Sequence, residues 1–110
     1  MEKLTFEQYN NWLSDTILNP QNDLLLQVLG ICGEAGEIAE KMKKIVRDKN
    51  GIISEEDKVL MAKELGDVLW YLARFAQSLD MTIEDIALMN MKKLESRVKR
   101  GVILGEGDER

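Results

Sequence analysis

The chain has 110 residues, so we expect one compact domain without a separate regulatory module. Twenty acidic residues against fifteen Lys and Arg give a formal charge of −5, which argues against a nucleic-acid-binding protein because such proteins need a basic surface. The sequence has no histidine and one cysteine, which excludes Ser-His-Asp catalysis, histidine-ligated zinc and a disulfide within the chain.

The first predicted helix covers about residues 6–17. Its apolar side chains recur at three- and four-residue spacing, and Thr5 with Gln8 gives the capping-box pattern that starts a helix. The pair Asn19-Pro20 then ends the pattern, because proline cannot continue a helix and restricts the residue before it.

The second predicted helix, over about residues 23–47, has the most regular pattern. Its apolar positions step alternately by four and three residues, which is a heptad-like seam that needs a partner helix. These positions are Leu24, Val28, Ile31, Ala35, Ile38, Met42 and Ile45. The Asn50-Gly51 pair that follows predicts a tight turn, because Asn-Gly readily supplies positive φ.

Two more helices are predicted after this turn. Ser54 precedes three acidic residues, which is typical of a helix N-terminus, and an apolar line continues over about residues 55–79. Thr82 is the predicted N-cap of a further helix over about residues 83–99. The pattern as a whole therefore predicts an all-α protein of four helices.

The predicted domain and its assembly follow from the lengths of these helices. We expect one domain over residues 1–100 and a mobile C-terminal tail over residues 101–110, which has three glycines and little to bury. Two antiparallel helices of about 25 residues, about 37 Å each, expose more apolar surface than two shorter helices cover. Self-association would bury that surface, so we predict a homodimer or homotetramer that forms a helical bundle.

Four carboxylates stand at i, i+3 spacing on the two long helices, Glu34 and Glu37 on one and Glu64 and Asp67 on the other. At 100° per residue, Glu34, Glu64 and Asp67 border the apolar stripes, while Glu37 lies further away. Acids that converge in a partly desolvated groove repel one another, and a bound divalent cation removes that conflict. Because every donor is an oxygen atom, we predict Mg²⁺, with Mn²⁺ as a substitute.

A second interpretation of these acids stays open, namely ordinary solvated helix charges paired with lysines such as Lys41 or Lys63. Four glycines inside the long helices bear on the choice, because each costs about 1 kcal/mol relative to alanine. They are Gly30, Gly33, Gly36 and Gly66. Either close helix packing or room for a ligand would explain them.

The last predicted helix carries a row of polar side chains beside its apolar face, formed by Asn90, Lys93 and Arg97. An amide, an ammonium and a guanidinium group in one row suit phosphate oxygens, through charge-assisted hydrogen bonds. The alternative is that the stems of Lys93 and Arg97 lie along apolar surface with their charged ends in water.

These motifs resemble those of the MazG-like nucleotide pyrophosphohydrolases, which belong to the all-α NTP pyrophosphatase superfamily. The resemblance covers about residues 24–100. The matching segments are Gly30-x-x-Gly33-Glu34-Ala35-Gly36-Glu37, Glu64-Leu65-Gly66-Asp67-Val68-Leu69-Trp70-Tyr71-Leu72 and Asn90-x-x-Lys93-Leu94-x-x-Arg97. The resemblance implies dimers or tetramers with sites where helices of different protomers meet. The implied reaction is Mg²⁺-dependent hydrolysis of a (deoxy)nucleoside triphosphate to the monophosphate and pyrophosphate, as nucleotide-pool house-cleaning.

The resemblance also implies roles for particular residues. The metal ligands and catalytic carboxylates would be Glu34, Glu37, Glu64 and Asp67, with either Glu34 or Glu37 orienting the attacking water. The substrate-binding residues would be Lys93 and Arg97 for phosphate oxygens, Asn90 as a neutral donor and Tyr71 for the base or sugar. Gly33 stands where the family has the first Glu of its opening acidic pair, which leaves the number of metal ions open.

Two other functions stay open on the sequence alone. One is a phosphoribosyl-ATP pyrophosphatase, which has a related fold and acid pattern, and the other is a non-catalytic helical dimer that binds nucleotides. We expect neither a nucleic-acid nor a membrane partner, because the chain is acidic and its polar faces carry mixed charge. The first residues lack the apolar run of a signal peptide, so we expect a cytoplasmic protein.

Overall fold

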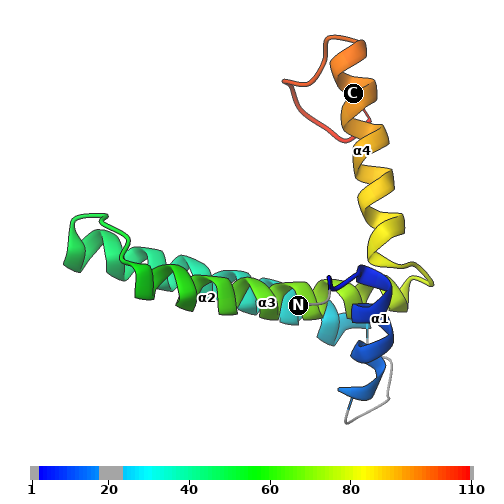
Figure 1. The fold of residues 1–110 in the computed structure, drawn as a ribbon. Helices are drawn as coiled ribbons and strands as arrows, with labels where there is room; N and C mark the ends of the chain where they lie inside the picture. Colours follow the sequence, from blue (N-terminus) through cyan, green and yellow to red (C-terminus); the bar gives the residue numbers. More distant parts are fainter. Residues whose placement is uncertain (1–2, 18–23, 110) are drawn as a thin grey trace.

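The computed structural model describes residues 3–17 and 24–109, which form four α-helices and no strand. The helices are α1 (Phe6–Asp15), α2 (Leu24–Lys49), α3 (Glu55–Ser78) and α4 (Ile83–Lys99) (Figure 1). The all-α prediction is confirmed. The predicted break at Asn19-Pro20 and the predicted helix start at residue 23 lie outside the described residues.

Side chains fix the starts of three helices. Each of these helices has a capping box, in which the N-cap hydroxyl accepts from a backbone amide and the side chain three residues on accepts in return. The pairs are Thr5 with Gln8, Ser54 with Asp57, and Thr82 with Asp85. α1 ends two residues before its predicted end, where the Thr16 hydroxyl donates to the Leu13 carbonyl at 2.6 Å.

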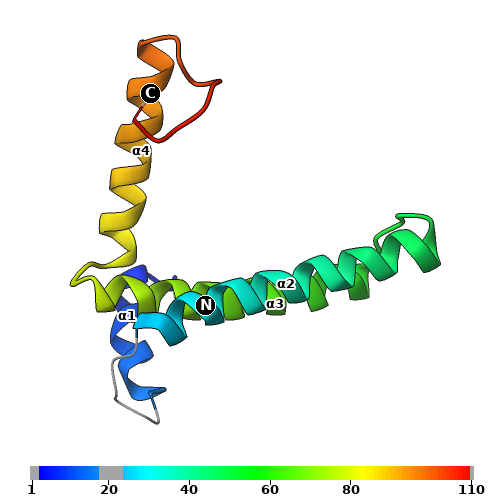
Figure 2. The same ribbon diagram turned by 180° about the vertical axis from the view of Figure 1, so that it is seen from behind.

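The two long helices, α2 and α3, lie side by side over most of their length and are joined at one end by a short turn (Figures 1 and 2). Asn50 and Gly51 both have positive φ in this turn, as the sequence predicts. The Lys49 ammonium and the Asp57 carboxylate form an ion pair of 2.8 Å across it. Ile45, from the heptad-like seam of α2, is buried between the two helices.

The core of the protomer lies where α1 crosses the second half of α3. Leu13, Ala73 and Ile83 are its buried centre, and Trp70 packs against them. The Trp70 indole donates a hydrogen bond to the Thr16 hydroxyl at 2.9 Å, which satisfies the only polar group of this large side chain. α1 therefore holds its place on α3 through both apolar and polar contacts.

The last helix, α4, extends away from the α2–α3 pair, as Figures 1 and 2 both show. Among the described residues its backbone approaches α1 and α3 but not α2. The Asn10 amide donates to the Glu84 carboxylate at 3.1 Å and ties the base of α4 to α1. The sequence offers no partner for the tail, but the structure folds it back so that Asp108 contacts Lys93 and Arg97 on α4.

Both the α2–α3 pair and α4 expose large apolar side chains to solvent. The exposed set includes Leu25, Leu26 and Leu29 on α2 and Leu88, Met89 and Met91 on α4. No helix among the described residues is long and apolar enough to cross a membrane.

Candidate active site

Three of the four predicted carboxylates meet on the α2–α3 pair. Glu34 comes from α2, and Glu64 and Asp67 come from one face of α3. One carboxylate oxygen of each lies within 4.8 Å of those of the other two. We call these three residues the acid triangle. Glu34 and Glu64 are partly buried and Asp67 is exposed, so the triangle sits at the edge of the helix interface.

The negative charges of the acid triangle repel one another, and this repulsion appears in the pKa of Glu34. Partial desolvation raises the pKa of the Glu34 carboxyl above its ordinary value, and the negative charges of Asp67 and Glu64 raise it further. A hydrogen bond with Glu64 contributes in the same direction. The Lys41 ammonium is 3.5 Å from the Glu64 carboxylate, which is the lysine pairing that the second interpretation of the acids expects.

The triangle fits a hard divalent cation. Its donors are all carboxylate oxygens, and two such oxygens on one Mg²⁺ lie up to about 4 Å apart, so small side-chain rotations would bring the three into range. One lysine offsets part of three negative charges, which leaves an excess that a divalent ion would neutralise. Glu34, Glu64 and Asp67 would hold such an ion.

The fourth predicted carboxylate, Glu37, lies outside the triangle. It is exposed on α2, one turn beyond Glu34, and its charge also raises the pKa of Glu34. The difference agrees with the helical wheel, which places Glu34 at the border of the apolar stripe and Glu37 further round the helix.

The helix glycines divide into two groups. A Cβ atom at Gly30 would overlap the ring of Tyr71, so this glycine permits close packing. Gly33, Gly36 and Gly66 face open space: apart from the backbone of their own helix and their chain neighbours, no atom of residues 3–17 or 24–109 lies within 4 Å of a Cβ placed there. Close packing within the protomer therefore explains Gly30 and leaves the other three open to a ligand or a second copy.

Tyr71 is predicted to contact the base or sugar, and the structure gives its ring two neighbours within the protomer. One side of the ring rests on the α2 backbone at Gly30, and Trp70 meets it edge-on with ring centroids 5.1 Å apart. The ring is thus held one turn beyond Asp67, with part of its surface already covered.

A second aromatic residue near the triangle is not apparent from the sequence. Tyr9 on α1 is half-buried, and burial, followed by the negative charge of Asp67, raises the pKa of its phenol. Its ring packs beside that of Trp12, with centroids 5.5 Å apart. The spacing from Tyr9 to Asp67 carries no periodic signal, so only the crossing of α1 over α3 reveals that they are neighbours.

The predicted phosphate-binding row does not face the acids of its own protomer. Lys93 and Arg97 instead contact the tail: the Arg97 guanidinium donates to the Asp108 carbonyl at 2.7 Å, and the Lys93 ammonium lies 3.4 Å from the Asp108 carboxylate. These two cations, Lys93 first, lower the pKa of the Asp108 carboxyl. Asn90 is exposed and lines, with Lys93, a separate hollow of about 400 Å³.

Comparison with known proteins decides the family. A model of the MazG nucleotide pyrophosphohydrolase domain matches residues 22–102. The chain belongs to the MazG family. The matched region contains the acid triangle, Glu37 and the whole of α4 with its basic row. The resemblance found in the motifs is confirmed.

A relative of this MazG chain is known from a virus. The Gene 37 protein of Mycobacterium phage L5 is 51% identical over 82 residues, which is 74% of this chain and 72% of that protein. No solved structure matches the chain. MazG membership gives a nucleotide pyrophosphohydrolase at the level of the family.

Proposed function

We propose that this MazG protein hydrolyses (deoxy)nucleoside triphosphates to the monophosphate and pyrophosphate with Mg²⁺, for which Mn²⁺ substitutes, and so clears or adjusts nucleotide pools in the cytoplasm. The observation that carries the proposal is the acid triangle, in which two helices bring three carboxylates within 4.8 Å. Carboxylate-held Mg²⁺ usually takes its remaining ligands from water and substrate phosphates.

The residues of the proposed site have three different roles. Glu34, Glu64 and Asp67 hold the cation, which when bound supplies positive charge that offsets the charge of the triphosphate. Glu37, beside the triangle but outside it, orients the attacking water. Tyr71, with Tyr9 near Asp67, offers aromatic surface to the base or sugar.

The reaction leaves each atom in a defined place. The water oxygen bonds to the α-phosphorus and remains on the monophosphate. The bond from that phosphorus to the bridging oxygen breaks, and its electron pair leaves with the pyrophosphate. The proton that the water releases passes to a nearby carboxylate and then to solvent.

The basic row enters the proposal through assembly. Lys93, Arg97 and Asn90 are carried on α4, which extends away from the α2–α3 pair that carries the triangle (Figure 2). We infer that they bind phosphate oxygens at the triangle of another protomer. The exposed apolar side chains on α2 and α4 support such a homodimer or homotetramer, because self-association would remove them from water.

A pyrophosphate-release screen tests the proposed function. The panel holds ordinary and modified (deoxy)nucleoside triphosphates together with phosphoribosyl-ATP, each with Mg²⁺ and with a chelator. We expect release from nucleoside triphosphates only when the metal is present, and its loss in Asp67→Asn. Glu56→Gln, which removes an exposed acid from the first turn of the same helix, is the matched control and should retain activity.

Three results would contradict the proposal. Release from phosphoribosyl-ATP alone would assign the related pyrophosphatase function. Binding of a non-hydrolysable triphosphate without turnover of any substrate would indicate a nucleotide-binding protein. Full activity of Asp67→Asn would show that the acid triangle has no role in the reaction.

A further inference from the structure

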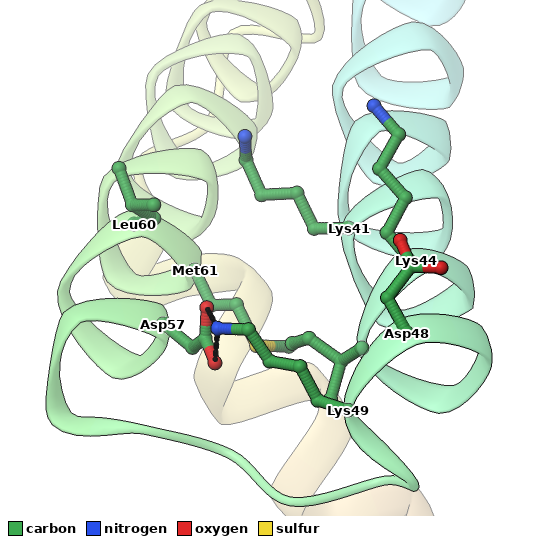
Figure 3. A pocket seen from close by; sticks show the side chains of 8 residues that line it. Lys41, Lys44, Asp48, Lys49, Asp57, Leu60 and Met61 are labelled. Carbon is green, nitrogen blue, oxygen red and sulfur yellow. Dashed lines mark hydrogen bonds and ion pairs between the residues drawn. The ribbon is translucent and has the colours of Figure 1, made fainter.

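A small pocket lies between α2 and α3, near the turn that joins them (Figure 3). One of its lining residues, Lys41, forms an ion pair with Glu64 of the acid triangle. Its volume is about 230 Å³, below the range of about 300–1,000 Å³ that is usual for drug-sized ligands, so it suits a small group. Apolar side chains form part of its wall, and three lysines, Lys41, Lys44 and Lys49, bring positive charge to it.

The two aspartates of this pocket already have cations of their own. Lys49 donates to both carboxylate oxygens of Asp57, at 2.8 and 3.0 Å, and with the capping contacts of Ser54 it lowers the pKa of Asp57 to about 2. Arg47 binds both oxygens of Asp48 at 2.8 and 2.9 Å. The charges of Asp57, Asp48 and Lys49 are therefore compensated locally.

The other two ammonium groups of the pocket are less tightly paired. The charge of Lys44 helps, after the hydrogen bond from Arg47, to lower the pKa of the Asp48 carboxyl. The Lys41 ammonium lies 3.5 Å from Glu64, longer than the Lys49–Asp57 contact, and no ion pair of Lys44 is found among the described residues. Figure 3 shows both side chains reaching away from the turn. The acids of the triangle also lie farther from the turn along α2 and α3 than the pocket does. Lys41 therefore borders the pocket and the triangle at once.

We propose that this pocket binds the β- and γ-phosphates of the substrate, with Lys41 and Lys44 as the donors, so that it holds the pyrophosphate that leaves. The proposal rests on the proposed function, because it takes the α-phosphate to lie at the acid triangle. The triphosphate then runs along the groove between α2 and α3 toward the turn.

The chemistry of the leaving group favours this placement. When the bond to the α-phosphorus breaks, negative charge appears on the bridging oxygen of the pyrophosphate, next to the triangle. An ammonium group at the border between triangle and pocket, as Lys41 is, stabilises that charge where it develops. Lys44 holds the distal phosphate through a charge-assisted hydrogen bond.

Titration of inorganic pyrophosphate into the full chain, with Mg²⁺ present, tests this pocket by calorimetry. We expect Lys44→Gln to weaken pyrophosphate binding about tenfold, the loss of one charge-assisted hydrogen bond. Lys41→Gln should weaken it at least as much. Lys43→Gln is the control, because Lys43 is exposed on the same helix and pairs with Glu40 at 3.2 Å.

Lys44→Gln is the deciding variant, since no ion pair of Lys44 among the described residues is lost with it, whereas Lys41→Gln also frees Glu64. A circular-dichroism melt confirms that each variant is folded. A deoxynucleoside monophosphate, titrated in parallel, should bind all variants equally, because it carries no β- or γ-phosphate.

The outcomes separate the pocket from the proposed function. Unchanged pyrophosphate affinity in Lys44→Gln and Lys41→Gln, in a chain that hydrolyses triphosphates, would overturn the pocket and leave the function intact. A parent chain that binds pyrophosphate through these lysines but hydrolyses no triphosphate would keep the anion site and overturn its role in the reaction. Equal weakening for the monophosphate would assign the lysines to general charge attraction and overturn the proposal.

Discussion

The α2–α3 pair carries the acid triangle, which we call the acidic half of the proposed site, and α4 carries the row of Asn90, Lys93 and Arg97, which we call the basic half. The two halves differ in whether their side chains come together within one protomer. On the α2–α3 pair, three carboxylates converge and Lys41 joins them within a single protomer. On α4, the basic row points elsewhere and is engaged by Asp108 of the tail. In the proposed site, the three converging carboxylates therefore come from one chain, while the basic row would reach them only from a second chain or after a movement of α4.

The largest expected effect concerns the acidic half. Glu64→Gln should lower kcat on the order of a hundredfold, since it removes a preorganised charge from the centre of the reaction. It should leave the melting temperature unchanged or higher, because one like charge leaves the crowded triangle. Paired steady-state kinetics and thermal melts check this. A variant that is active, or inactive only because it is unfolded, would break the assignment.

The basic half should affect binding more than the chemical step. Lys93→Ala should raise KM about tenfold with kcat little changed, since its ammonium holds substrate in the ground and transition states alike. Mixing it with Glu64→Gln under conditions that exchange subunits should restore low-KM activity if one site takes residues from two protomers. Activity no greater than the sum of the two separate variants would place the whole site in one chain.

The glycines offer a matched pair for stability. Gly30→Ala should cost about 1–3 kcal/mol of unfolding free energy, because the new methyl group overlaps the Tyr71 ring. Gly33→Ala should raise the protomer's stability by up to about 1 kcal/mol, since its Cβ meets open space and alanine favours the helix. Urea unfolding at one protein concentration measures both. A destabilised Gly33→Ala would show that another copy packs there.

The smallest expected effect is a dependence of the protein's stability on pH, through Asp57 at the turn between α2 and α3. The folded pKa of Asp57, about 2, lies below the ordinary value of 3.8, so its contacts with Lys49 and Ser54 stabilise the fold above about pH 4. This contribution should decline as the pH falls toward 2. The difference in melting temperature between the parent chain and Asp57→Asn should therefore shrink from pH 5 to pH 2. A constant difference would mean that the ionised carboxylate contributes nothing.

Local spacing made much of the fold and the acidic half predictable. The caps at Thr5, Ser54 and Thr82 follow from side chains three residues apart, and the helical wheel separates the partly buried Glu34 from the exposed Glu37. Such patterns are set within one helix or one helix pair, where the 3.6-residue period fixes which side chains are neighbours.

The remaining features depend on contacts between distant segments. The direction of α4 is set by its junction with α1 and α3, including the Asn10–Glu84 hydrogen bond, and no periodicity encodes it. The approach of Tyr9 to Asp67 and the return of Asp108 to Arg97 are likewise tertiary. These features determine where the basic row lies. The sequence therefore predicts which side chains suit phosphate oxygens, but it does not predict where α4 places them relative to the acid triangle.

Binding of Mn²⁺, followed by electron paramagnetic resonance, tests the acid triangle most directly, because it needs neither substrate nor turnover. The parent chain should bind the ion saturably, Mg²⁺ should displace it, and both Glu64→Gln and Asp67→Asn should lose the binding while Glu56→Gln retains it. Equal Mn²⁺ binding by the parent chain and the two triangle variants would show that these carboxylates are ordinary surface charges.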